Sequence, residues 1–149
     1  MLYNDALTEM YNDGLENLWR TVKATPEDKM EWAPAPDART ARALLEEIVM
    51  TTGFSTGLIV TGAMGPMDDA PADSPKKTLA QLEAEHRAAS IELLKTIKEF
   101  PDARLQETVD LPWGTMTMLQ IIWYPYWNLM YHWGQIAYIQ TMYGDKDMH

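Results

Sequence analysis

The chain has 149 residues and a formal net charge of −10, from 12 Lys and Arg against 22 Asp and Glu. That length suits one domain with a continuous hydrophobic core. The sequence contains no cysteine, which excludes a disulfide, a thiolate metal ligand or a cysteine nucleophile supplied by this chain. Its acidic charge repels phosphate backbones and its basic residues are scattered, so we expect no nucleic-acid partner.

Two features place the chain among soluble proteins, and we expect it in the cytoplasm with no membrane partner. The N-terminal stretch carries acids throughout and lacks the basic start and unbroken apolar core of a secretory signal. Residues 111–144 lack Asp, Glu, Lys and Arg, which by length alone would permit a membrane span. Polar residues recur along this stretch, its aromatics are spread along its length, and acids flank it, so we predict a buried helix instead.

The first half of the chain predicts two helices. Residues 4–23 place apolar side chains on one face and acids toward the other, the pattern of a surface helix with one buried stripe. Thr40 is a suitable N-cap for a second helix that runs to about Thr61. The proline-containing segment "EWAPAPDA" before it is expected to be extended. The Gly, Pro and Asp residues of "GAMGPMDDAPADSP" then predict a loop.

The second half predicts two more helices joined by a crossover. The third helix is expected to start at Ser74 and to end before Pro101. Residues 102–114 alternate like a strand but are short and isolated, so we expect an extended crossover and no sheet. Thr117, with a Gln three residues later, predicts a capping box and a fourth helix that continues to Tyr143.

Together these elements predict an all-α fold, a four-helix bundle with a long crossover before the last helix, in one domain spanning residues 1–149. In the fourth helix both faces are apolar or aromatic, which is typical of a helix buried on all sides. We expect the side that carries Trp123, Met130 and Trp133 to form a homodimer.

Three segments carry a resemblance to a known family: "EWAPAPDARTARALLEEI" before and into the second helix, "WGTMTMLQII" at the entry to the fourth, and "HWGQIAYIQTMYG" at its end. In this order they resemble the DinB-like superfamily of four-helix bundles, which includes thiol-dependent transferases and isomerases. The resemblance covers nearly the whole chain and implies the same bundle. It also implies a small-molecule pocket between the second and fourth helices, and a divalent metal (Ni, Zn, Fe or Mn) bound there by three histidines.

Carried onto this sequence, the metal-ligand positions fall on Glu47, seven residues after Thr40, and on Asn128 and His132, four residues apart on one helix face. Only His132 keeps the imidazole that the family uses. A carboxamide offers a metal only its carbonyl oxygen, so we expect the metal to be absent or weakly bound.

Three interpretations of Glu47, Asn128 and His132 stay open. They are a weak divalent metal site, a hydrogen-bonded cluster in which Glu47 accepts from His132 or Asn128, and a metal-free small-molecule pocket with His132 as a catalytic acid or base. His86, on the inward row of the third helix, is expected to be a satisfied core residue.

Two functions follow from the resemblance. The first is an enzyme, a metal-dependent thiol transferase or hydrolase-like protein, whose low-molecular-weight thiol would come from solution because the chain has no cysteine. The alternative is a non-catalytic dimeric bundle, ligand-binding or stress-associated, that has lost the metal. Direct action on DNA is disfavoured by the acidic charge.

Overall fold

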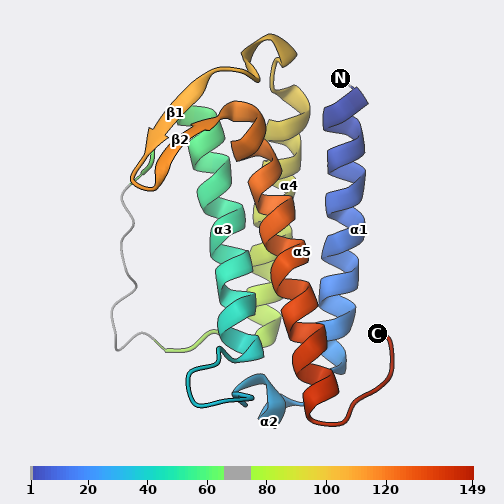
Figure 1. The fold of residues 1–149 in the computed structure, drawn as a ribbon. Helices are drawn as coiled ribbons and strands as arrows, with labels where there is room; N and C mark the ends of the chain where they lie inside the picture. The colour runs from blue at the N-terminus through green and yellow to red at the C-terminus, as the bar shows by residue number, and fades with distance from the viewer. Residues whose placement is uncertain (1, 66–74) are drawn as a thin grey trace.

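The computed structural model describes residues 2–65 and 75–149. Four long helices run side by side, with the N-terminal helix α1 next to the C-terminal helix α5 (Figure 1). The elements in chain order are α1 (Leu2–Ala24), α2 (Glu27–Met30), α3 (Ala41–Thr61), α4 (Leu79–Glu99), a 3-10 helix (Asp102–Arg104), β1 (Thr108–Leu111), β2 (Gly114–Thr117) and α5 (Met118–Met142). The predicted four-helix bundle is confirmed, with the crossover lying before α5.

Side-chain caps explain where three of the helices begin. Thr40 accepts a hydrogen bond from the backbone of Ala43 at the start of α3, and Thr117 forms the predicted capping box at the start of α5. The expected start of the third helix at Ser74 was wrong. Ser74 itself lies outside the described residues, but helix α4 begins at Leu79, because a second capping box at Thr78 fixes its first turn.

A two-stranded antiparallel hairpin replaces the extended crossover that the sequence predicted. Strands β1 and β2 pair from Thr108 opposite Thr117 to Leu111 opposite Gly114. The error lay in treating β1 as isolated, although its partner is the segment directly before the α5 cap. Gly114 has a φ of 131°, which favours glycine and allows the tight turn between the strands. The hairpin lies at the end of the bundle where α5 begins (Figure 1).

Helix α5 is not buried on all sides, and this corrects a second expectation. Its buried face packs in the core, but Trp127 and Tyr131 are about half exposed. The side chosen for a homodimer is also partly covered, because the Trp133 indole donates to Thr21 on α1 at 2.9 Å and Met130 packs against the core. Helix α1 therefore covers part of the face on which a partner was expected, while Trp123 remains 39% exposed.

Helix α3 is the one described helix that is long and apolar enough to cross a membrane by length and composition. Half of its apolar window is buried inside the bundle, where α3 packs against both α4 and α5. The buried half of α3 therefore contributes to the core of the bundle.

Candidate functional site

The three residues that the sequence singled out meet between α3 and α5. The carboxylate oxygen Oε1 of Glu47 lies 2.9 Å from Nε2 of His132 and accepts a 3.3 Å hydrogen bond from Nδ2 of Asn128. Asn128 and His132 are almost fully buried, whereas the Glu47 side chain is 30% exposed. The hydrogen-bonded cluster considered from the sequence is therefore present.

Two further residues extend this cluster at both ends. Arg39 donates through Nη1 to the other carboxylate oxygen of Glu47, Oε2, and through Nη2 to the carbonyl of Ala43 at 2.9 Å. At the other end, Nδ1 of His132 lies 2.6 Å from Oε1 of Gln135. The result is a continuous chain from Arg39 through Glu47 and His132 to Gln135, which we call the polar network.

The charge of Glu47 is stabilised within this network. Burial alone would raise the pKa of the carboxyl, but hydrogen bonds from His132 and Arg39, together with their charges, outweigh it and hold the pKa below its ordinary value of 4.5. The pKa of the Tyr124 phenol is raised, mainly by burial and also by the negative charge of Glu47. Tyr124 therefore lies within electrostatic range of the network.

The residues present do not fit a divalent metal as they are arranged. Both oxygens of Glu47 and both ring nitrogens of His132 already face hydrogen-bond partners, and the Arg39 guanidinium places a positive charge against the carboxylate. No group of three His, Cys, Asp or Glu side chains suited to a metal occurs within residues 2–65 and 75–149. Among Glu47, Asn128 and His132, Oδ1 of Asn128 is a buried acceptor without a donor, and one amide oxygen is a weak ligand.

A broad groove of about 650 Å³ opens beside the polar network. Its described lining is mostly apolar and comes from the segment before α3, the start of α3 and the C-terminal half of α5. The lining residues are Pro34, Ala35, Ala38, Arg39, Leu44, Tyr131, Gly134, Gln135, Tyr138, Ile139 and Met142. Arg39 and Gln135, the outer members of the polar network, thus also form part of the groove wall. Glu47 and His132 do not line the groove themselves. They are connected to it by hydrogen bonds, Glu47 to Arg39 and His132 to Gln135.

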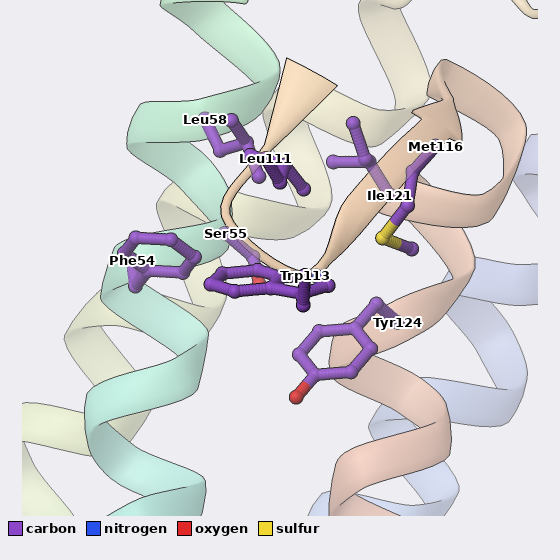
Figure 2. A pocket seen from close by; sticks show the side chains of 8 residues that line it. All are labelled: Phe54, Ser55, Leu58, Leu111, Trp113, Met116, Ile121 and Tyr124. Carbon is purple, nitrogen blue, oxygen red and sulfur yellow. The ribbon is translucent and has the colours of Figure 1, made fainter. Parts of the chain in front are cut away.

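A second, much smaller cavity of about 20 Å³ lies under the hairpin. Figure 2 shows the indole of Trp113, at the hairpin tip, between Phe54 on α3 and Tyr124 on α5. Apart from the Ser55 hydroxyl and the Tyr124 phenol, its described lining is apolar. A volume of this size holds about one water molecule, so this cavity is too small to be the ligand site.

Exposed aromatic rings connect the two cavities along α5. Tyr124 stacks on Trp127 with ring centroids 5.8 Å apart, and Trp127 stacks on Tyr131 at 5.1 Å. Tyr124 lines the small cavity and Tyr131 lines the groove. The polar network therefore lies beside a half-exposed aromatic row.

The other two histidines lie outside the network. His86 is fully buried, accepts a hydrogen bond from the Trp19 indole at Nδ1 and lies 3.3 Å from the Tyr11 hydroxyl at Nε2. Burial, with the charge of Arg87, lowers its pKa to about 4. His86 is the satisfied core histidine that the sequence predicted. His149 bonds Asp145 near the C-terminal end of the described chain.

Arg39 was not predicted from the sequence, because its position has no periodic relation to Glu47. Arg39 comes directly before the N-cap Thr40 and eight residues before Glu47, so it is outside the helix and outside the usual spacing of helical ion pairs. Its side chain folds back along the first turns of α3 to reach Glu47. Gln135, three residues after His132 on the same helix, was given no role from the sequence.

Comparisons with known proteins support the fold and the family. No curated protein matches the chain. A solved DinB-like protein from Bacillus subtilis superposes with a TM-score of 0.74 at 12% identity, covering 97% of this chain and 96% of its own. A DinB family member from Shewanella denitrificans has a TM-score of 0.58 at 16% identity, covering 97% of this chain and 85% of its own. The sequence matches the DinB superfamily over residues 10–136, and the chain therefore belongs to that superfamily.

Proposed function

We propose that this DinB bundle binds a small molecule in the groove and that the polar network takes the place of a metal centre. One observation carries the proposal: Arg39 and Gln135 both line the groove, and Arg39 bonds Glu47 while Gln135 bonds His132, which are bonded to each other. A ligand that contacts Arg39 or Gln135 is therefore one hydrogen bond away from Glu47 or His132. Apolar grooves with a few placed polar groups are the usual form of small-molecule sites.

His132 and Glu47 are the proton-transfer pair in this proposal. A hydrogen bond of 2.9 Å joins them, and Glu47, whose side chain is 30% exposed, is the partner nearer to solvent. His132 remains the proposed catalytic residue, with Glu47 holding the ring in place. Glu47 and Asn128 thus serve as hydrogen-bond partners of His132 instead of as metal ligands.

The thiol chemistry implied by the family takes a different form here. A metal would lower the pKa of a bound thiol, but the donor set does not suit a metal. A low-molecular-weight thiol that enters the groove would instead have its thiolate form stabilised by the charge of Arg39 in the groove wall. Because the chain has no cysteine, the nucleophile would still come from solution.

Gly134 provides a direct test of the groove. It lines the groove, and a Cβ added there meets no atom within 4 Å, so Gly134→Leu places a side chain in the groove without a clash at Cβ. Gly57 on α3 is equally unobstructed and lies outside the groove, so Gly57→Leu is the matched control. We expect fragment mixtures to shift amide signals at groove residues in nitrogen-edited NMR spectra of wild type and Gly57→Leu, but not of Gly134→Leu. Fragments that bind all three proteins alike, or none, contradict the proposal.

A second candidate function rests on the exposed aromatic row. Trp127 and Tyr131 stack on each other at the surface of α5 and are 45% and 51% exposed. Aromatic residues of this kind are enriched at protein interfaces. The alternative is therefore a non-catalytic, homodimeric bundle in which this row packs against a second copy.

A further inference from the structure

We infer that the ligand of the groove is an amphiphile with one carboxylate and an apolar body, bound with the carboxylate at Arg39. This inference rests on the proposed groove function and adds the chemical class of the ligand. Among the described residues that line the groove, Arg39 is the one charged side chain. Its side chain is 46% exposed, so its guanidinium is accessible from the groove.

Arg39 has donors left for a ligand. Its bonds to Glu47 and Ala43 use one N–H on each terminal nitrogen, which leaves Nε–H and a second N–H on Nη1 and on Nη2. A guanidinium fits a carboxylate through two parallel hydrogen bonds, which adds both strength and direction. Arg39 can therefore bind a ligand carboxylate while it keeps its bond to Glu47.

The rest of the groove favours an apolar body. Met142 and Tyr138, which are 48% and 66% exposed, supply accessible apolar walls, whereas Leu44 and Ile139 are almost fully buried beside them. An alkyl or aryl body that covers these side chains gains about 25 cal/mol for each Å² of apolar surface removed from water. A compact, highly charged ligand would leave these walls uncovered.

A cationic ligand is disfavoured despite the acidic net charge of the chain. Glu47, the acid that is bonded to Arg39, is not among the lining residues, and both of its oxygens already accept hydrogen bonds. The overall charge of −10 acts weakly at the groove, because salt screens charges beyond about 8 Å at physiological ionic strength. The local positive charge of Arg39 therefore makes the groove favour an anionic ligand over a cationic one.

Calorimetric titration with four small probes tests the ligand class on the full chain. The probes are octanoate, its neutral analogue octanamide, octylammonium, and acetate, which has the charge without the chain. We expect octanoate to bind wild type about tenfold more tightly than octanamide, and acetate and octylammonium to bind more weakly still. Equal binding of octanoate and octanamide, or tighter binding of octylammonium, would overturn the ligand class.

Variants locate the effect at Arg39. In Arg39→Gln, octanoate should lose about tenfold in affinity and become equal to octanamide, whereas Arg20→Gln, an exposed arginine on α1 outside the groove, should keep the wild-type preference. A preference that survives Arg39→Gln contradicts the inference. If octanamide binds but octanoate is not preferred, the groove proposal stands and only the ligand class fails. If no probe binds and Gly134→Leu changes nothing in the fragment titration, the groove proposal fails as well.

Discussion

At the scale of single residues, the Glu47 carboxylate organises the site. It accepts hydrogen bonds from three side chains, Arg39 before α3 and Asn128 and His132 on α5. Removing this shared acceptor leaves the buried donors of Asn128 and His132 unpaired, at a typical cost of about 1–3 kcal/mol for each buried group. The network should therefore respond to substitution as a unit.

Glu47→Gln should change how stability depends on pH. Because the folded pKa of Glu47 is lowered, its charge contributes stability above its ordinary pKa of 4.5, and this contribution is lost as the pH falls through the folded pKa. The difference in unfolding free energy between wild type and Glu47→Gln should shrink as the pH falls below about 4.5. Urea unfolding across this range checks it, with Glu9→Gln on α1 as the control. A constant difference would show that the carboxylate is not stabilised by the network.

His86 should make the protein sensitive to mild acid. Its pKa is about 4 in the folded chain against 6.5 ordinarily, so the unfolded chain takes up a proton between these pH values and the folded chain does not. Stability should fall by about 3 kcal/mol from this residue as the pH drops through that window. In His86→Gln, which keeps an acceptor for Trp19, the curve of unfolding free energy against pH should be flatter by that amount. An unchanged slope would mean that His86 is already charged in the core.

A triple variant tests why the metal positions do not suit a metal. Glu47→His with Asn128→His restores the imidazoles of the family, and Arg39→Gln removes the competing cation. We expect the triple variant to bind Ni²⁺ or Zn²⁺ and to melt at a higher temperature when the metal is added. The double variant with Arg39 retained should bind more weakly, and equal binding by both would contradict the role given to Arg39.

At the scale of the elements, close approach between α1 and α5 depends on one glycine. A Cβ on Gly14 would lie 2.9 Å from Cδ2 of the fully buried Leu129 and 3.3 Å from the sulfur of Met130. Gly134, on the same helix as those two residues, has open space instead. The two glycines should therefore respond oppositely to the same substitution.

Gly14→Ala should destabilise the protein and Gly134→Ala should stabilise it. Overpacking costs about 1–3 kcal/mol and helix propensity returns about 1 kcal/mol, so the net loss at Gly14 is about 1 kcal/mol. At Gly134 only the propensity gain of up to about 1 kcal/mol applies. Chemical unfolding at neutral pH measures both, and a stabilising Gly14→Ala would show that α1 and α5 are not closely packed there.

The elements also show what sequence patterns could and could not predict. Helix periodicity and side-chain caps were enough to predict α1, α3 and α5, because these signals depend only on residues that are close in the sequence. The start of α4 was predicted too early because a serine followed by a proline, as at Ser74 and Pro75, is a common helix start. The capping box that begins the helix is instead at Thr78. The hairpin was missed because strand pairing depends on a partner, and β2 had been assigned to the helix entry. Contacts between distant segments, such as Arg39 with Glu47, likewise have no periodic signal.

At the scale of the whole molecule, the bundle buries its apolar faces but leaves the aromatic row on α5 exposed. The face first expected to form a dimer is partly covered by α1, through Trp133 and Met130. Trp127 and Tyr131 are exposed, and we expect the dimer interface to form there instead. A dimer through this row would bring a second copy close to the groove, because Tyr131 also lines it.

Light scattering at micromolar concentration tests the dimer. We expect twice the monomer mass of 17.0 kDa for wild type, and a monomer for the double variant Trp127→Gln with Tyr131→Gln, because aromatic residues commonly supply most of the binding energy of an interface. Met10→Gln, which removes an exposed apolar side chain from α1, is the control and should remain a dimer. A monomeric wild type would contradict the dimer and leave the groove proposal unaffected.

The central claim is that the polar network occupies the position of the family's metal. Anomalous diffraction from crystals of untagged protein soaked in Zn²⁺ or Ni²⁺ tests it most directly. We expect no anomalous peak among Glu47, Asn128 and His132, with the bond between Glu47 and His132 intact and Arg39 against the carboxylate. A strong peak at coordination distance from Nε2 of His132, with Arg39 turned away, would contradict it.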